Sequence, residues 1–149
     1  MPRAVRSLRL DAPPDRAFAA CVRLLESPDP RRGVVSRVSR PSPPRVGSVV
    51  VSSVRGRGAE LRELCSRVTV LDAPREVATE TMDATPTVCT RLRVEAQGDG
   101  SLVTLSSEVD AGLGEGRAAG FLDALIFGRA QRKSARATLR RVSELTSER

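Results

Sequence analysis

The chain has 149 residues, of which 40% are hydrophobic, and a formal net charge of +7. This length suits one domain with a sizeable core, the composition excludes a disordered chain, and no apolar run is long enough to span a bilayer. The sequence contains no histidine, which excludes Ser-His and Cys-His catalytic pairs and histidine metal ligands, so we expect neither a metal nor a cofactor.

The first expected elements are a strand and a helix. Residues 3–10, RAVRSLRL, alternate loosely and suit a strand, and Asp-Ala-Pro-Pro follows at once. Asp11 or Ala12 suits a helix N-cap and Pro13 the first helical position, where a missing N–H costs nothing. Apolar residues then recur at i, i+3, i+4 and i+7 up to about Ser27, before two prolines, which indicates a helix. SPDPRR (27–32) suits a second short helical turn.

The middle of the chain predicts an antiparallel meander. Alternating or β-rich segments separated by turn residues occupy 33–40, 46–54, 60–71, 76–82, 87–96 and 102–109. For the last hairpin we predict a register in which paired residue numbers sum to 199, so that Val94 faces Leu105 and Ala96 faces Val103. This register gives the meander one apolar face.

One long helix is expected from about 117 to 146, a stretch without proline. Spaced at 100° per residue, an apolar stripe runs along it. A second stripe is basic, and Leu122 and Ile126 continue it toward the helix start. The apolar stripe consists of Phe121, Ala124, Leu125, Gly128, Ala135, Leu139 and Val142, and the basic face of Arg129, Arg132, Lys133, Arg136 and Arg140.

These elements predict an α+β helix-grip fold, with a curved antiparallel sheet of about seven strands wrapped around a long C-terminal helix. The order is β-α(-α)-β6-α, and residues 1–149 are expected to form a single domain. The apolar face of the meander needs a cover, and the final helix is the one large apolar surface left to provide it.

The segments DAPPDRAF (11–18), VGS (46–48) and GDGSLVTL (98–105) resemble the START and birch-pollen-allergen superfamily (SRPBCC). The nearest branch is the polyketide cyclase/dehydrase and lipid-transport group, and the resemblance covers almost the whole chain. It implies a cavity between the sheet and the last helix that binds apolar small molecules. The residues it implies as cavity lining are Val68, Val70, Leu92, Val94, Val103, Leu105 and Ser107 on strands, and Leu122, Leu125, Ile126 and Arg129 on the helix.

The chain departs from that pattern in its aromatic residues. It has no Trp or Tyr and only three Phe, whereas aromatic-ring cyclases of this fold tend to use tyrosine, histidine or tryptophan in the pocket. Any general acid or base must be Asp, Glu, Cys, Lys133 or water. The best catalytic candidates that remain are Glu80, Glu108 and Arg91 or Arg129, although no spacing marks a pair.

Three functions follow, and the first is favoured. In the first, the protein binds a small apolar or amphiphilic ligand, and one arginine at the cavity mouth pairs with a carboxylate or enolate of that ligand. Alternatively, it is a cyclase/dehydratase-like enzyme without histidine or metal, or an interaction protein that uses the basic face of the last helix. The lack of Tyr and Trp stacking platforms disfavours nucleic acid.

Two further expectations concern cell context and assembly. The first residues have no secretory pattern, and three cysteines without a CxxC pair suit reduced thiols, so we expect a cytoplasmic protein. Leu122, Ile126 and Phe127 either line the cavity mouth or lie in the interface of a homodimer.

Overall fold

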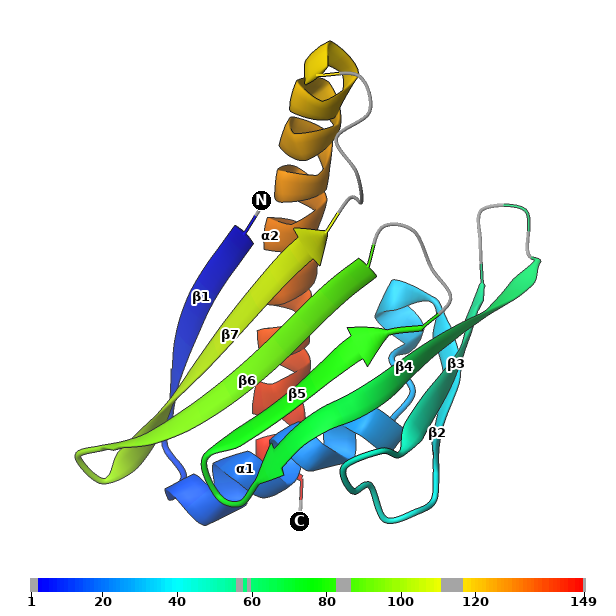
Figure 1. Ribbon diagram of the computed structural model, residues 1–149. Helices are drawn as coiled ribbons and strands as arrows, with labels where there is room; N and C mark the ends of the chain where they lie inside the picture. The colour runs from blue at the N-terminus through cyan, green and yellow to red at the C-terminus, as the bar shows by residue number, and fades with distance from the viewer. Residues whose placement is uncertain (1–2, 56–57, 59, 83–86, 111–116, 149) are drawn as a thin grey trace.

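A computed structural model describes residues 3–55, 58, 60–82, 87–110 and 117–148, with side chains described for these residues except 110–131. Seven strands form one curved antiparallel sheet in the order β1-β7-β6-β5-β4-β3-β2. Figure 1 shows α1 and the long α2 on the same face of this sheet. The strands are β1 (Arg3–Leu10), β2 (Val34–Arg40), β3 (Val49–Arg55), β4 (Leu61–Asp72), β5 (Glu76–Thr81), β6 (Thr87–Gln97) and β7 (Gly100–Asp110), and the helices are α1 (Pro14–Arg23), the 3₁₀ turns η1 (Leu24–Glu26) and η2 (Pro30–Arg32), and α2 (Arg117–Ser147). The predicted helix-grip architecture is confirmed.

Helix α1 begins one residue later than predicted. Pro13 is the N-cap and Pro14 the first helical residue, because the N–H groups of Arg16 and Ala17 both donate to the Pro13 carbonyl, at 3.1 and 3.0 Å. The predicted helical segment ends at Ser27, after the 3₁₀ turn η1. The second short turn, η2, ends at Gly33, whose φ of 76° lies in the left-handed region that favours glycine.

The predicted register of the last hairpin is wrong by two residues. Val94 pairs with Val103 and Ala96 with Ser101, so paired numbers sum to 197 instead of 199. The reason is a tighter turn: pairing continues to Gln97 and Gly100, and Gly98 takes the positive φ that a two-residue hairpin turn requires. Because the shift is even, every side chain stays on its predicted face.

The inner face of the sheet, the one toward α1 and α2, holds the core. Helix α1 contributes Phe18 and Cys21, and the described part of α2 contributes Ala135, Leu139 and Val142 from the predicted stripe. The sheet residues buried against them are Leu10, Val50, Val68, Val77, Leu92, Val94, Val103 and Leu105. Alternation along each strand puts charged residues such as Arg91, Arg93 and Glu108 on the opposite, outer face, together with a few apolar ones such as Val5.

No helix in the described part of the chain is both long and apolar enough to cross a membrane.

Candidate functional site

A cavity of about 320 Å³ lies on the inner face of the sheet, beside the core. Part of its wall is apolar, formed by residues such as Leu25, Val77 and Leu92 that also belong to the core cluster. The rest carries hydroxyl and guanidinium groups. The described lining residues are Leu24, Leu25, Arg32, Arg37, Val50, Ser52, Leu64, Ser66, Val77, Thr79, Thr81, Val88, Thr90, Leu92, Ser134 and Thr138. The cavity therefore has an amphiphilic lining.

The hydroxyl groups come from neighbouring strands at matched register. Ser66 on β4 lies opposite Thr81 on β5, and Thr79 on β5 lies opposite Thr90 on β6. Directly opposite residues share a face, so these four side chains form a polar stretch on the inner face. A hydroxyl both donates and accepts hydrogen bonds, so this stretch suits the polar part of a ligand.

Two arginines complete the polar wall. Arg32, on η2, donates from Nη1 to Thr138 Oγ1 at 3.1 Å and from Nη2 to Ser134 Oγ at 2.8 Å. Arg37, on β2, donates from Nε to Ser52 Oγ at 3.0 Å and from Nη1 to the Leu24 carbonyl at 3.1 Å. The first pair of bonds ties η2 to α2, and the second ties β2 to β3 and η1.

Burial disfavours the charge on both arginines. Desolvation lowers the pKa of Arg32, and Arg140 lowers it further, while the Asp29 carboxylate acts in the opposite direction. Desolvation also lowers the pKa of Arg37, followed by repulsion from Arg32, again opposed by Asp29. The cavity wall thus holds two partly desolvated cations that repel each other.

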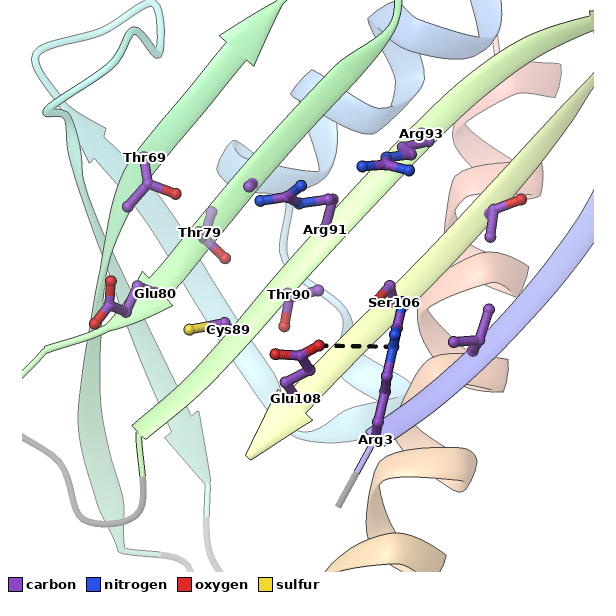
Figure 2. A pocket seen from close by; sticks show the side chains of 13 residues that line it. Arg3, Thr69, Thr79, Glu80, Cys89, Thr90, Arg91, Arg93, Ser106 and Glu108 are labelled. Carbon is purple, nitrogen blue, oxygen red and sulfur yellow. Dashed lines mark ion pairs between the residues drawn. The ribbon is translucent and has the colours of Figure 1, made fainter. Parts of the chain in front are cut away.

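A second hollow, of about 390 Å³, lies on the outer face (Figure 2). Most of its charged groups have an ion-pair partner: Glu76 beside it accepts from Arg93 Nε at 2.7 Å and lies 3.4 Å from Arg91 Nη1. Across the same face, Arg3 Nε lies 3.6 Å from the Glu108 carboxylate, the pair joined by the dashed line in Figure 2. These contacts suit a surface on which most charges neutralise one another.

Three of the catalytic candidates, Glu80, Glu108 and Arg91, lie on that outer face. Glu80 and Glu108 both lie directly opposite Cys89 in the sheet, on either side of it, and Arg91 follows two residues along β6. All three are exposed and line the outer hollow, not the cavity next to α2. The structure therefore brings the candidates together, but away from the place where the resemblance implies a ligand.

The predicted cavity residues on strands divide into three groups. Leu92 lines the cavity. Val68, Val94, Val103 and Leu105 are buried in the core beside it, and Ser107 is buried on β7. Val70 pairs with Ala78, on the outer face, because an irregularity between Val68 and Val70 shifts the register, and Leu71 takes the inward position opposite Val77.

The candidates on α2 are only partly described. Leu122, Leu125, Ile126 and Arg129 lie outside the residues whose side chains are described, as does Phe127. Of the basic face, Arg132, Lys133, Arg136 and Arg140 are exposed.

Arg32 and Arg37 were not among the predicted site residues. The signal available was weak, because Val34 and Val35 put an apolar residue on each face of the strand and so hid the inward position of Arg37. For Arg32, its hydroxyl partners are more than 100 residues away in the chain.

Among the described residues, no three His, Cys, Asp or Glu side chains are grouped closely enough to hold a metal ion. Burial raises the pKa of the Cys21 thiol to about 12, so it is a protonated core residue at neutral pH.

A curved antiparallel sheet that grips a C-terminal helix beside a cavity defines the START and birch-pollen-allergen class of proteins (SRPBCC). The chain belongs to the polyketide cyclase / dehydrase and lipid transport family, whose model matches residues 1–145. No functionally curated protein matches its sequence.

Solved structures show the same fold. Ara h 8.0201 is 14% identical, with a TM-score of 0.74 over 98% of both chains. The di-domain ARO/CYC BexL from the BE-7585A biosynthetic pathway is 19% identical, with a TM-score of 0.71 over 99% of this chain and 50% of its own. The di-domain ARO/CYC StfQ from the steffimycin biosynthetic pathway is 10% identical, with a TM-score of 0.75 over 97% of this chain and 50% of its own. The chain therefore spans half the length of these two di-domain proteins.

Proposed function

We propose that this protein binds a small amphiphilic molecule in the cavity between the sheet and α2. The observation that carries the proposal is the lining of that cavity, where aliphatic core residues meet a set of hydroxyl and guanidinium groups. Ligand sites in proteins are typically concave and mostly apolar, with a few polar groups that orient the ligand. The volume of about 320 Å³ is at the low end of the range for such sites, which favours a small ligand.

The family and the likeness to di-domain ARO/CYC proteins keep a cyclase/dehydratase-like enzyme as the second candidate. Among the described lining residues, the cavity has arginines, serines and threonines but no carboxylate, cysteine or lysine. Proton transfer in the cavity would thus depend on hydroxyls or bound water, which are weak acids and bases at neutral pH. This composition favours binding over catalysis.

The third candidate is an interaction through the basic face of α2, whose four described cations are exposed. Such a contact with a polyanion weakens steeply as salt rises from about 50 to 200 mM. Changing Arg132, Lys133 and Arg136 together to Glu would abolish it without affecting a ligand in the cavity.

The first test is to find what the purified protein carries. With no Trp or Tyr, the chain is nearly silent at 280 nm, so absorbance there reports a bound chromophore. Solvent extraction and mass spectrometry then identify the molecule, including a colourless one. A 260 nm band removed by high salt would instead support the basic face of α2.

A second test blocks the cavity with a bulky side chain. Ser66 lies on its wall and not on the outer hollow, and Ser66→Trp introduces a large side chain that is also the only tryptophan of the chain. A ligand at a hundred times its Kd raises the free energy of unfolding by about 2.7 kcal/mol in the wild type. We expect the variant to fold, to lose that gain and to carry no extractable ligand. A gain that persists in the folded variant would contradict binding in this cavity.

A further inference from the structure

Arg32 and Arg37 both line the cavity, and both are held by neutral groups. Their four hydrogen-bond acceptors are three hydroxyl oxygens and one backbone carbonyl. No ion pair among the described residues includes either arginine. The two positive charges are therefore positioned by the fold without a carboxylate in direct contact.

Both guanidinium groups keep donors available. Each has five N–H groups and uses two of them in the hydrogen bonds above, so three on each have no acceptor among the described residues. The bonds that are made also hold each guanidinium in place. A donor fork that is already oriented loses little freedom when it binds an oxyanion in a bidentate manner.

The local charge favours an anion. Arg32 and Arg37 repel each other, Arg140 adds a third positive charge near Arg32, and the buried Asp29 carboxylate opposes this repulsion at both arginines. Partial burial strengthens a charge interaction relative to water. An anion placed against the two arginines would offset the repulsion between them.

The apolar wall lies in the same cavity. Leu25, Val77 and Leu92 line it together with the two arginines. A ligand that satisfies both parts of the lining has a small hydrocarbon body and one compact anionic group.

We propose that the cavity selects amphiphiles with an oxyanion head group, a carboxylate or a phosphate monoester, which Arg32 and Arg37 bind together while the hydrocarbon body lies against Leu25, Val77 and Leu92. This inference rests on the proposed function and specifies its ligand class. It places the polar anchor on η2 and β2, rather than on the Arg129 of α2 or on the outer-face arginines.

The test compares three ligands that share one alkyl chain: octanoate, octyl phosphate and 1-octanol. Titration calorimetry on the wild-type protein is expected to give a Kd for at least one anion about tenfold lower than for 1-octanol, since hydrogen bonds to charged groups are worth about that factor. The ratio between the two anions identifies the head group. This comparison needs no variant and so does not depend on the folding of one.

Variants then assign the effect to the two arginines. We expect Arg37→Gln and Arg32→Gln each to weaken anion binding about tenfold and to change the Kd of 1-octanol less than threefold. Arg37→Lys keeps the charge but lacks the planar fork, so it recovers only part of the loss. Arg75→Gln, an exposed change in the turn between β4 and β5 that leaves the cavity lining intact, is the matched control and keeps wild-type affinities.

The outcomes separate the two claims. Equal affinities for the anions and 1-octanol would overturn the selection for an oxyanion and leave cavity binding standing. Anion preference that survives both glutamine substitutions would overturn the role of Arg32 and Arg37. If none of the three ligands binds, both the proposed function and this inference fail.

Discussion

Arginine side chains have opposite surroundings on the two faces of the sheet. On the outer face, Arg91 and Arg93 share the Glu76 carboxylate and Arg3 lies against Glu108. On the inner face, Arg32 and Arg37 are held by hydroxyls and a carbonyl, and the pKa of each is lowered by desolvation. The outer arginines form a neutralised surface, whereas the inner ones leave positive charge facing a cavity.

This difference shows why arginine content alone says little about function in this chain. Exposed ion pairs contribute little free energy and are screened by salt. A partly buried guanidinium without a carboxylate carries a desolvation cost that a bound anion can offset. The environment of an arginine, and not its presence, distinguishes the two faces.

The largest expected contrast is in the free energy of unfolding that is lost when a valine on each face is shortened to alanine. Val103 is 0% exposed on the inner face, and Val5 is 54% exposed on the outer face. Val103→Ala should lower the free energy of unfolding by about 2–3 kcal/mol, through lost burial and a residual cavity, and Val5→Ala by less than about 1 kcal/mol. Urea unfolding measures both. Similar losses for the two variants would mean that the helices do not cover the inner face as the structure has them.

The cysteines provide a second contrast, which depends on pH. Burial raises the pKa of Cys21 to about 12, above its ordinary value of 9.0. The unfolded thiol therefore loses its proton first, so the stability from this group is complete below about pH 9 and falls by roughly 1 kcal/mol per pH unit from there to about pH 12. Unfolding of wild type and Cys21→Ala across this range checks the difference, and parallel pH profiles would refute it.

Thiol alkylation reports the same contrast without a substitution. Cys89 is exposed on the outer face, Cys65 is half-buried and Cys21 is buried. At pH 8 we expect iodoacetamide to modify Cys89 first, and Cys21 only after denaturant is added, as followed by mass spectrometry. Modification of Cys21 in the native protein at the rate of Cys89 would contradict its burial.

The smallest expected effect is the loss of an outer ion pair. Glu76→Gln keeps the shape of the side chain but removes the charge that pairs with Arg91 and Arg93. We expect a loss of less than about 1 kcal/mol at low salt, which disappears near 1 M salt because screening removes the attraction. Glu63→Gln, an exposed change with no ion pair among the described residues, is the control. A larger loss that persists at high salt would give the outer face a structural role.

Periodicity predicted the elements and most of the core. Alternation assigned Val94, Val103 and Leu105 to one face, and the structure buries all three. The hairpin register was wrong, yet its effect was limited because an error of two residues preserves the face of each side chain. The irregularity near Thr69 has a larger consequence than the register error, because it moves Val70 to the other face. No residue type in that stretch predicts the irregularity.

The candidate site was less predictable than the fold. The catalytic candidates Glu80, Glu108 and Arg91 were chosen by chemical type, and the structure places them on the outer face. Which carboxylate faces a cavity depends on strand parity and on the register of neighbouring strands. The sequence predicts strand parity more reliably than it predicts register.

The sequence by itself determined the order of strands and helices, the apolar face of the meander and the apolar stripe of α2, because these depend on local repeats of two and 3.6 residues. Only the tertiary structure decided that Arg32 meets Ser134 and Thr138 on α2, and that Arg37 meets Ser52 and the Leu24 carbonyl around the same cavity. The physical reason is that each of these contacts joins different elements, and for Arg32 distant segments of the chain. Their positions follow from how helices and strands pack, and the periodicity within one element does not predict that packing.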